Sequence, residues 1–349
     1  MSDNLQKRRE AYYARMAERR LVPLWTIMAQ AVPSEPTPNC EPAFWNFARD
    51  IRPALLEAGE LISAEEAERR VLILNNPGLQ RGTTKTLLCA IQMIKGGEVA
   101  PAHRHTQSAL RFVIEGAGAY TAVNGERISM SPGDFIVTPA WTWHDHSKES
   151  EGPMIWLDGL DIPLVNHLGA TFSEEFDERS YPETRPADDS RARYGSGLLP
   201  LEPVVTRHHS PVLSYPYDRT REALEALRRS NEWNACHGLK LKYSNPTSGD
   251  FVLPTIATFI QLLPKGFSGT PHRSTESTIV MAVEGRGRAT VGNRTFSFGS
   301  HDIFVIPNWT WATLEADEDA VLFSFSDRAA LEKLALLREQ CGNEAASIT

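Results

Sequence analysis

The sequence predicts a mostly β protein of two tandem barrels preceded by a helical segment, and three observations support this fold class. From about Val71 onward, short runs of β-branched and aromatic residues alternate with glycine and proline, as in barrels and sandwiches. Before that point the hydrophobic pattern is helical. Part of the first β region also recurs in the second, which indicates that one domain was duplicated.

The repeat consists of two matched blocks in the same order. HRHTQSALRFVIEGAG at 103–118 matches HRSTESTIVMAVEGRG at 272–287, and GDFIVTPAWTWH at 133–144 matches HDIFVIPNWTWA at 301–312. The offset is 169 residues for the first block and 168 for the second. An ordered double match at a nearly constant offset is hard to obtain by chance.

Five segments follow from this pattern. Residues 1–70 form the N-terminal helical segment, in which Ser63 and Glu66 make a capping box for a helix running to Arg70. The first barrel covers 71–172 and the second covers 239–326. Residues 173–238, rich in proline and charge, are expected to connect the barrels, with one helical piece near 220–230. A helix from Asp327 to Gln340 is expected in the C-terminal segment 327–349.

Composition excludes several classes of partner. With 349 residues, 41% hydrophobic and 23% charged, the chain can bury two cores. A net charge of −8 argues against a nucleic-acid partner, and no apolar run reaches the length of a membrane span. The first residues contain no apolar signal core, so we expect a cytoplasmic protein without a membrane partner. The four cysteines are scattered without CxxC spacing, which predicts free thiols in a reducing compartment.

Three histidines in the first barrel predict a metal site. His103 and His105 are separated by one residue, so on a strand both imidazoles point to the same face. His144 lies on a later strand, and strands distant in sequence face each other across the interior of a small barrel. A single histidine is more often an ordinary core or surface group, but three in this arrangement can converge on one ion.

These histidines, with Gly97, Gly116, Gly133 and Pro139 at the expected intervals, resemble the cupin superfamily. Most cupins add a glutamate shortly after the HxH pair, and Ala109 occupies that place here. The site would then hold a dication with three neutral ligands, which suits a dianionic chelating substrate. With APAHRHTQSALRF, GDFIVTPAWTWHDH and WLDGLDIPLV, the chain resembles the gentisate and salicylate 1,2-dioxygenases, bicupin enzymes, over roughly residues 42–325.

Strand parity gives candidate pocket residues. If 88–92 is a strand with Gln92 inward, Leu88 and Ala90 share its face, and Gln107, Ala109 and Arg111 likewise share a face. An inward arginine needs an anion. The family resemblance favours a substrate carboxylate as the partner of Arg111, and the alternative is a structural ion pair with Glu115.

The resemblance also implies that Gln92, His146 and Asp158 surround the metal ligands. His146 could hydrogen-bond the substrate phenolate or dioxygen, with Asp158 orienting it; alternatively, His146 caps a strand end. Arg70 and Arg69 are further candidates for a carboxylate contact, or ordinary cations at a helix C-terminus.

The second barrel lacks two of the three histidines. His272 matches His103, but Ser274 and Ala312 stand where the first barrel has His105 and His144. One histidine does not hold a transition metal, so we expect a scaffold or subunit-contact domain. Tryptophan pairs at 141/143 and 309/311 occur in both barrels, which favours packing over substrate stacking.

The resemblance implies an iron(II) enzyme that opens gentisate between the carboxyl- and hydroxyl-bearing carbons, giving maleylpyruvate. Salicylate or a substituted salicylate is the next substrate, then 1-hydroxy-2-naphthoate, because Leu88 and Cys89 differ from the residues expected there. Other classes are a zinc or nickel isomerase or hydrolase, and a non-catalytic metal-binding cupin. The resemblance also implies a homotetramer.

Overall fold

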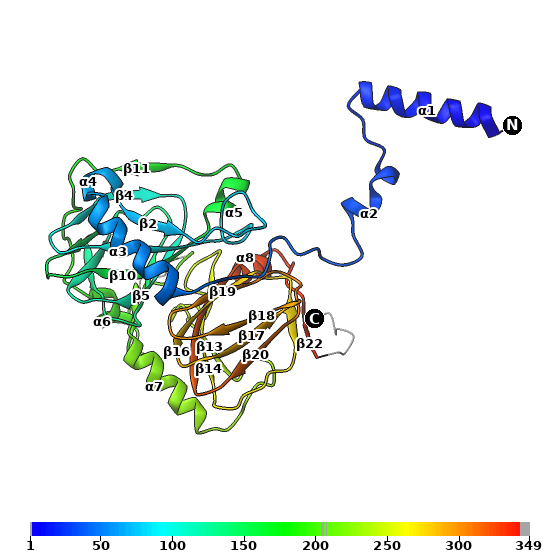
Figure 1. Cartoon of the computed structure of the whole chain (residues 1–349). Coiled ribbons are helices and arrows are strands. Elements are labelled where there is room, and N and C mark those ends of the chain that lie inside the picture. Colours follow the sequence, from blue (N-terminus) through cyan, green and yellow to red (C-terminus); the bar gives the residue numbers. More distant parts are fainter. Residues whose placement is uncertain (1, 204–205, 207, 343–349) are drawn as a thin grey trace. The chain divides into compact units, whose positions relative to one another are not determined.

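The structure is a computed structural model that describes every residue except 1, 204–205, 207 and 343–349. It divides into two units, Met1–Thr37 and Pro38–Thr349. The first unit contains the helices α1 (Ser2–Glu18), η1 (Leu24–Thr26) and α2 (Met28–Ala31) (Figure 1). The second unit contains both barrels.

The first barrel is built from two antiparallel sheets. Its strands are β2 (Arg70–Ile73), β3 (Leu88–Ile94), β4 (Val99–His105), β5 (Ala109–Glu115), β6 (Ala119–Val123), β7 (Glu126–Ser129), β8 (Phe135–Thr138), β9 (His144–Lys148) and β10 (Met154–Leu160), joined by β11 (Ser173–Glu175) and β12 (Ser214–Tyr215). One sheet has the order β12-β8-β5-β10-β3-β2, and the other β11-β4-β9-β6-β7.

The second barrel repeats this plan. Its strands are β13 (Leu239–Lys242), β14 (Ala257–Leu263), β15 (His272–Ser274), β16 (Thr278–Glu284), β17 (Gly287–Val291), β18 (Arg294–Phe298), β19 (Ile303–Ile306), β20 (Ala312–Ala316) and β21 (Ala320–Ser326), joined by β1 (Ala43–Trp45) and β22 (Glu339–Cys341). The sheets have the orders β1-β19-β16-β21-β14-β13 and β18-β17-β20-β15-β22. The fold is therefore mostly β with two tandem barrels, as the sequence predicts.

Helices and short connections flank the barrels. They are η2 (Phe47–Ile51), α3 (Arg52–Leu61) and α4 (Ala64–Ala67) before the first barrel, α5 (Ile162–His167), α6 (Asp189–Tyr194) and α7 (Tyr217–Arg228) between the barrels, and α8 (Arg328–Lys333) after the second. The helical piece expected near 220–230 is α7. The Ser63 side chain caps α4 by accepting from Glu66 N at 3.1 Å, as the capping box predicts.

Each barrel contributes one sheet to the contact between the barrels, and this contact explains the continuous apolar runs in the sequence. Strand β5 is buried along nearly its whole length, because one face lines its own barrel and the other packs against the second. Phe112 belongs to a core shared by both barrels, and its ring lies 4.4 Å from that of Phe323, while Val113 packs inside the first barrel. Strand β17, which lies away from this contact, alternates between buried and exposed residues.

The strand that precedes each barrel in the sequence pairs with a strand of the other barrel; we call these two strands, β1 and β12, the leading strands. Strand β1 precedes the first barrel but pairs with β19 of the second, and β12 precedes the second barrel but pairs with β8 of the first. One hydrogen bond repeats in both places. Phe47 N donates to Asp302 Oδ1 at 2.9 Å, and Tyr217 N donates to Asp134 Oδ1 at 3.0 Å. Each barrel is thus completed by a segment that belongs to the other in sequence.

Three local expectations from the sequence are wrong. The helix after Ser63 ends at Ala67, because Glu68 adopts φ 52°, and Arg70 begins a strand. The helix expected to reach Gln340 ends at Lys333, and β22 follows it and pairs with β15. The segment before residue 70 is not helical throughout, since it contains β1.

The expectation of four free thiols is also wrong. Cys236 and Cys341 form a disulfide, while Cys40 and Cys89 are free and buried. The two bonded residues are 105 positions apart in sequence. They meet because β22 folds back along β15, where Cys341 lies opposite His272, and because Thr270 N donates to Ala235 O at 2.8 Å beside Cys236. Spacing along the chain does not reveal this return.

Candidate metal centre

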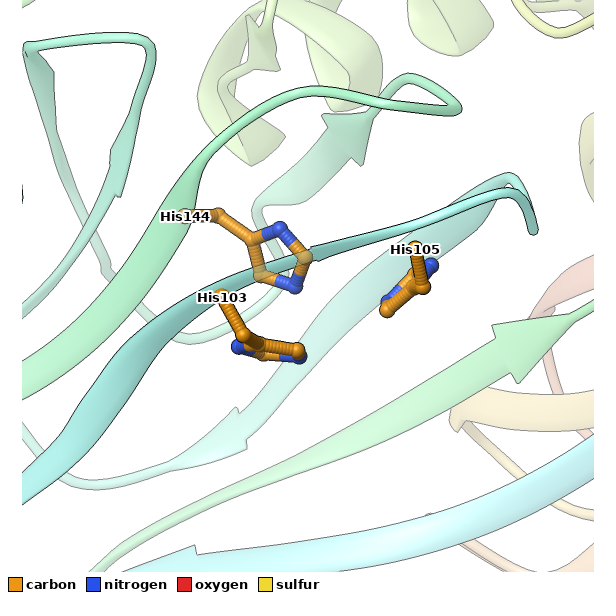
Figure 2. Close-up of side chains that lie close together, drawn as sticks. All are labelled: His103, His105 and His144. Carbon is orange, nitrogen blue, oxygen red and sulfur yellow. The ribbon is translucent and has the colours of Figure 1, made fainter. Parts of the chain in front are cut away.

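The three histidines predicted from the sequence come together in the first barrel. His103 and His105 lie on β4 and His144 lies on β9, where it is the cross-strand partner of His103. One ligand atom from each residue lies within 4.8 Å of the others, and Figure 2 shows the three rings converging. Across residues 2–203, 206 and 208–342, this is the one group of at least three His, Cys, Asp or Glu with this geometry.

Each of the three rings is oriented through its Nδ1. That nitrogen lies within hydrogen-bond distance of a backbone oxygen two residues away: Pro101 O at 3.2 Å from His103, Gln107 O at 3.0 Å from His105, and Thr142 O at 2.9 Å from His144. With a proton on Nδ1, each Nε2 carries the lone pair that a metal ion needs. The residues therefore fit a metal bound by three imidazole nitrogens.

Burial keeps these imidazoles neutral. It lowers the pKa of His103 to about 3 and that of His105 to about 4, and it holds the pKa of His144 well below its usual range. The guanidinium of Arg69 lowers the pKa of His103 further. Ala109, in the place of the usual cupin glutamate, is buried and brings no carboxylate to the group.

Arg69 lies directly against the histidines. Its Nη2 donates to Pro101 O at 2.8 Å and lies 2.7 Å from His103 Nδ1, while its buried Nε has no hydrogen-bond partner. Arginine has only donors, so His103 Nδ1 cannot both accept from Arg69 and donate to Pro101. We assign the proton to Nδ1, because in the other tautomer the proton would be on Nε2 and that nitrogen could not bind a metal ion. Arg69 then has donors left for an anion.

Arg111 is fully buried and held by three side chains. It contacts Thr138 Oγ1 through Nη1, it lies 2.9 Å from His146 Nε2 through Nη2, and its Nε is 3.4 Å from Asp158 Oδ1. Burial raises the pKa of Asp158 to about 6, against the opposing effect of Arg111. The alternative in which Arg111 pairs with Glu115 is wrong, since Glu115 pairs with Arg52 at 2.9 Å.

His146 lies in the middle of β9 and not at a strand end, so the capping alternative is wrong. Because Arg111 can only donate, His146 Nε2 accepts from it and Nδ1 donates to Thr121 Oγ1 at 2.9 Å. Asp158 bonds to Trp156 Nε1 at 3.1 Å and pairs with Arg111, so it orients the arginine and not His146, contrary to the expectation. Burial and the nearby Arg111 place the pKa of His146 well below its usual range.

Strand register places the remaining pocket candidates. Asp158 is the cross-strand partner of both Arg111 and Ala90, so Ala90 shares their face of the sheet. By the two-residue period of β3, Leu88 and Gln92 lie on the same face, as the sequence predicts. Gln92 is buried, and Leu88 is half-buried.

Arg70 is placed away from the histidines. Its guanidinium bonds to Glu98 at 2.6 Å and to Ile62 O at 2.9 Å, and the side chain is buried. Its neighbour Arg69, which the sequence could not separate from it, occupies the site instead, because successive residues of an extended chain point in opposite directions. The contacts of Thr121 and Thr138 were not anticipated, and no motif marks them in the sequence.

Each tryptophan pair packs against an arginine of its own barrel. The Arg104 guanidinium lies 4.5 Å from the Trp141 ring and 4.6 Å from the Trp143 ring, and both rings are half-buried. Arg273 lies 4.4 Å from Trp309 and 4.7 Å from Trp311. The duplicated unit is thus a cation–π stack, and in the first barrel Trp141 also packs against Phe172 at 4.4 Å and Trp143 against Phe176 at 5.1 Å. The tryptophans therefore pack against protein side chains, at half-buried positions and not in the core. The signal was present in the sequence as an arginine repeated at the same offset.

Comparison with known proteins agrees with this geometry. Residues 90–160, which include all three histidines, match the family model described as a cupin domain. The chain is 48% identical to gentisate 1,2-dioxygenase 1 of Aquipseudomonas alcaligenes, over 95% of this chain and 96% of that protein. The chain belongs to the gentisate 1,2-dioxygenase family. It is therefore a ring-cleaving dioxygenase of the bicupin type.

Other members of this family differ in their named substrates. A 5-aminosalicylate 1,2-dioxygenase from Comamonas is 36% identical over 97% of this chain and 91% of its own. The structure of salicylate 1,2-dioxygenase from Pseudoaminobacter salicylatoxidans with gentisate superposes with a TM-score of 0.89, at 32% identity, covering 96% of this chain and 94% of that one. In the part of the chain that the structure describes, no helix is both long and apolar enough to cross a bilayer.

Proposed function

We propose that this family member is an iron(II) enzyme that cleaves gentisate between its carboxyl- and hydroxyl-bearing carbons and forms maleylpyruvate. The observation that carries the proposal is the charge of the site. Three neutral imidazoles meet without a carboxylate, and two buried guanidinium groups lie beside them. A site of this kind favours a ligand that brings its own negative charges, such as an aromatic carboxylate with an ortho hydroxyl.

His103, His105 and His144 would hold the iron. Bound there, iron(II) would supply the reaction of dioxygen with the ring, and both oxygen atoms enter the product. Imidazole nitrogens suit iron, zinc, copper and nickel alike, so the choice of iron rests on the resemblance to the family.

Arg69 is our first choice for the substrate carboxylate. Its Nε is buried without a hydrogen-bond partner, and its Nη2 lies beside a ring nitrogen that it cannot use. An anion at this position would accept from both nitrogens in the bidentate geometry that guanidinium groups favour. A pinned carboxylate fixes the orientation of the ring relative to the metal ligands, and orientation contributes to the rate.

Arg111 would provide the second positive charge. Its contacts with His146, Thr138 and Asp158 hold the guanidinium in one orientation, so it is preorganised for a substrate oxygen. In this assignment His146 positions Arg111, and His146 would reach the substrate phenolate or dioxygen only after that bond opens.

Leu88, Ala90 and Gln92 would form the wall beside the aromatic ring. Their side chains differ in size and polarity, so they would decide which ring substituents fit. Salicylate, a substituted salicylate and 1-hydroxy-2-naphthoate are therefore the alternative substrates, consistent with the 5-aminosalicylate enzyme among the relatives.

Oxygen uptake by the iron(II)-loaded protein tests the proposal. The panel would contain gentisate, salicylate, 5-aminosalicylate and 1-hydroxy-2-naphthoate, with benzoate as a control that has the carboxylate but lacks the ortho hydroxyl. We expect uptake with gentisate and formation of maleylpyruvate, and none with benzoate. Uptake with salicylate alone would transfer the assignment to that substrate. No uptake with any member would favour a metal-binding protein without this activity.

Metal analysis of protein purified without added metal separates the remaining classes. Iron supports the dioxygenase, whereas zinc or nickel that sustains no oxygen uptake supports an isomerase or hydrolase. We also propose a cytoplasmic homotetramer, as the family resemblance implies, in which the second barrel contributes subunit contacts. Light scattering that shows a monomer at micromolar concentration would contradict the tetramer.

A further inference from the structure

We propose that the second barrel binds a small monovalent anion, of the size of formate or chloride, in its interior beside Lys240. The site does not depend on the ring-cleaving reaction. It lies where the first barrel gathers its three histidines, since the counterparts His272, Ser274 and Ala312 all line it. With two of the three imidazoles replaced, the same part of the second barrel has a different chemistry.

The site is a small cavity with a volume of about 50 Å³. A water molecule takes up roughly 30 Å³ of the liquid, so the cavity has room for about one or two groups of that size. Val280 and Leu314 contribute to an apolar wall, and the charged residues of the lining are Lys240, Arg273 and Glu276. An apolar wall limits the access of water, so a charge in the cavity is weakly screened.

Lys240 is the cation of this lining that has no anionic partner in contact. Among the described residues it makes no hydrogen bond and no ion pair, and its ammonium group lies 4.5 Å from the centre of the Phe259 ring. Burial lowers the pKa of Lys240, and the carboxylates of Glu276 and Glu339, which are not in contact with it, offset this effect only in part. An anion against the ammonium group would stabilise its charged form.

The other two charged residues of the lining already have partners. Glu276 accepts from Arg328 Nη2 at 2.8 Å through Oε1 and from Ser326 Oγ at 2.5 Å through Oε2. Arg273 donates from Nε to Gln340 Oε1 at 2.5 Å and stacks on the two tryptophans of its barrel. The carboxylate is therefore engaged elsewhere, and the lysine is the charge that an added ion would balance.

Three neutral side chains of the lining can donate to the same ion. Ser324 Oγ is buried and has no hydrogen-bond partner. Ser274 Oγ accepts from Glu276 N at 3.2 Å, which leaves its own proton to donate. Burial lowers the pKa of His237 to about 2, so its ring is neutral and keeps one N–H, which bonds to no described residue. Two hydroxyl groups, one imidazole and one ammonium group form a set of donors that suits an anion.

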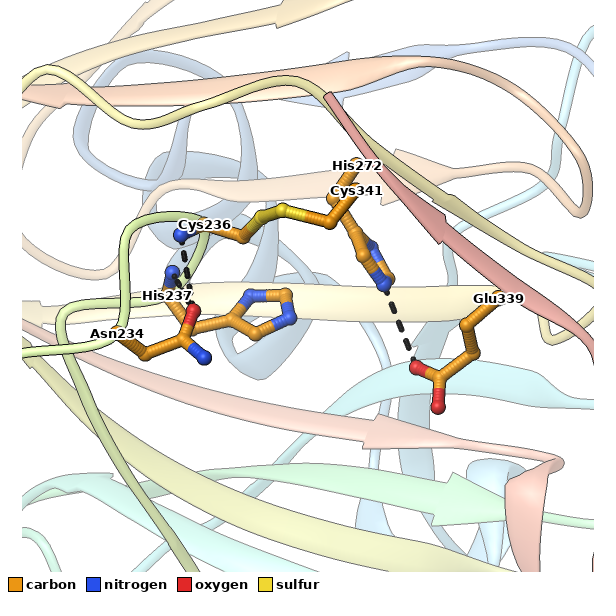
Figure 3. The surroundings of a disulfide bond; sticks show 6 residues. All are labelled: Asn234, Cys236, His237, His272, Glu339 and Cys341. Carbon is orange, nitrogen blue, oxygen red and sulfur yellow. Dashed lines mark hydrogen bonds and ion pairs between the residues drawn. A yellow bond between two sulfur atoms is a disulfide. The ribbon is translucent and has the colours of Figure 1, made fainter. Parts of the chain in front are cut away.

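The disulfide holds His237 beside the cavity. His237 lies in the loop before β13, where Cys236 N and His237 N both donate to Asn234 Oδ1, at 2.8 Å and 3.0 Å. The bond from Cys236 to Cys341 joins this loop to β22, and Figure 3 shows the ring of His237 beside that of His272. The loop is thereby fixed at both its turn and its sulfur atom, so the imidazole is a preorganised donor.

Strand register shows that the second barrel has lost the buried ion pair of the first. Ser324 is the cross-strand partner of Val280, just as Asp158 is the partner of Arg111. Valine and serine thus stand where the first barrel has its arginine and aspartate. Because both partners are replaced together, no charge is left unpaired at these two positions, and the serine hydroxyl remains in the interior.

The same register shows that a cation has been added at another position. Lys240 is the cross-strand partner of Gln261, just as Val71 is the partner of Gln92. The lysine therefore stands where the first barrel has an apolar residue. Each barrel has a cation in its interior, but in the second barrel it comes from a different strand and has no carboxylate against it.

A larger pocket gives a route from solvent. It has a volume of about 380 Å³, and His237 and Lys240 line it as well as the inner cavity. Lys242, Arg328, Glu232 and Glu339 also line this outer pocket. The two spaces meet at the proposed donors, so an anion can approach the ammonium group from outside, and the volume of the inner cavity excludes larger anions such as sulfate.

Thermal unfolding of the full-length protein in sodium formate tests the site. A ligand that binds only the folded state raises the melting temperature as its concentration increases. We expect a saturable rise for the wild type that Lys240→Met loses, and calorimetric binding weaker by about tenfold or more in this variant, because a charge-assisted hydrogen bond is removed. Formate bound in the first barrel would affect both proteins alike. Sodium sulfate should show no difference that depends on Lys240.

Two further variants separate this site from general effects of salt. Lys242→Met removes an exposed lysine of the same strand, whose Nζ donates to Gly249 O at 2.9 Å, and should keep the full rise with formate. Ser324→Ala removes the buried hydroxyl and should weaken formate binding while oxygen uptake is unchanged. Without formate, Lys240→Met should be at least as stable as the wild type, because a buried charge without a partner is costly. A variant that is less stable at every formate concentration, with the rise retained, would make Lys240 a structural cation and overturn the proposal.

Bromide locates the ion directly. In crystals soaked with sodium bromide, we expect an anomalous scattering peak beside the ammonium group of Lys240 in the wild type and no such peak in Lys240→Met. No peak in the wild type, or a peak that survives the substitution, would contradict the assignment. A peak without any formate-dependent rise in solution would mean an adventitious ion only, and that result would overturn the proposal as well.

Discussion

Asp161 and Asp327 hold equivalent positions in the two barrels, and each accepts a hydrogen bond from a threonine of the opposite barrel. Asp161 accepts from Ser108 N at 2.9 Å and from Thr255 Oγ1 at 2.5 Å. Asp327 accepts from Ser277 N at 2.9 Å and from Thr86 Oγ1 at 2.7 Å. The contact between the barrels is thus reciprocal, like the interface of a twofold symmetric dimer.

This pair of aspartates predicts how stability depends on pH. Burial raises the pKa of both carboxyl groups to about 6, above the value of an unfolded aspartate. A raised pKa means that folding favours the protonated carboxyl group. The contribution of the two groups to the free energy of unfolding is therefore complete below about pH 4. It is lost as the pH rises through about 6. Asp161→Asn with Asp327→Asn should flatten the decline in unfolding free energy between these values, as measured by urea titration across the window. An unchanged slope would contradict the assignment.

The proposed iron site and the asymmetry of the repeats together predict which barrel iron binding depends on. His105→Ala removes one of three ligands, and we expect loss of iron and of oxygen uptake. Ser274→Ala changes the matching position of the second barrel and should leave both nearly unchanged. Iron content by mass spectrometry on the unreduced proteins makes the comparison. Equal loss of iron from both variants would contradict a single iron site.

The two arginines of the site predict different outcomes. Arg69→Met should retain iron and weaken substrate binding by about 2–5 kcal/mol, the usual cost of breaking a buried charged pair on one side. Arg111→Met should weaken binding and also lower the melting temperature, because Asp158 would lose its buried partner. Melting temperature, iron content and substrate affinity would be measured on each.

Two further variants serve as controls for the arginine experiment. Arg70→Met breaks the buried pair with Glu98 and should lower stability without changing the Michaelis constant. Glu115→Gln breaks a partly exposed pair with Arg52, which is worth about 0–1 kcal/mol, and should change neither. Unchanged affinity in Arg69→Met would remove this residue from the substrate contact.

The contact between barrels predicts a steric limit at Gly159. A Cβ there would lie 2.8 Å from Phe325 Cε2 and 2.9 Å from Leu110 Cγ, in the core that both barrels share. Gly159→Ala should destabilise the protein by about 1–3 kcal/mol, the usual cost of overpacking. Gly299→Ala is the matched control, because the nearest atom to its Cβ outside the adjoining residues would be Asp302 Oδ2, 3.9 Å away. Equal melting temperatures for the two variants would contradict the close packing.

The sequence predicts the fold and the convergence of the three histidines for one physical reason. Strand period and repeated blocks can be read directly from the sequence, and they bring His103, His105 and His144 together as the structure does. The partners of Arg111 and the role of Arg69 depend on which strands become neighbours, and that information is not local. Arg69 and Arg70 are indistinguishable in sequence, yet one faces the histidines and the other faces Glu98.

Long-range contacts were missed even where the repeat contains a trace of them. Thr86 and Thr255 share the 169-residue offset of the repeats, but nothing in the sequence indicates that each bonds to an aspartate of the opposite barrel, as the structure shows. The Cys236–Cys341 bond has no counterpart in the first barrel, so the repeat gives no indication of it. His237 lies beside His272 for the same reason, through a loop outside the matched blocks.

The exchange of leading strands fixes the order in which the barrels can be finished during translation. The first barrel has its last strand once Ser214–Tyr215 has left the ribosome. Ala43–Trp45 emerges early but has no partner until Ile303–Ile306 is made, and the linked residues Phe47 and Asp302 are 255 positions apart. The nascent chain therefore carries an unpaired strand through most of its synthesis, and such edges invite association with other chains. A ribosome stalled before residue 303 would leave the first barrel closed and this strand without its partner.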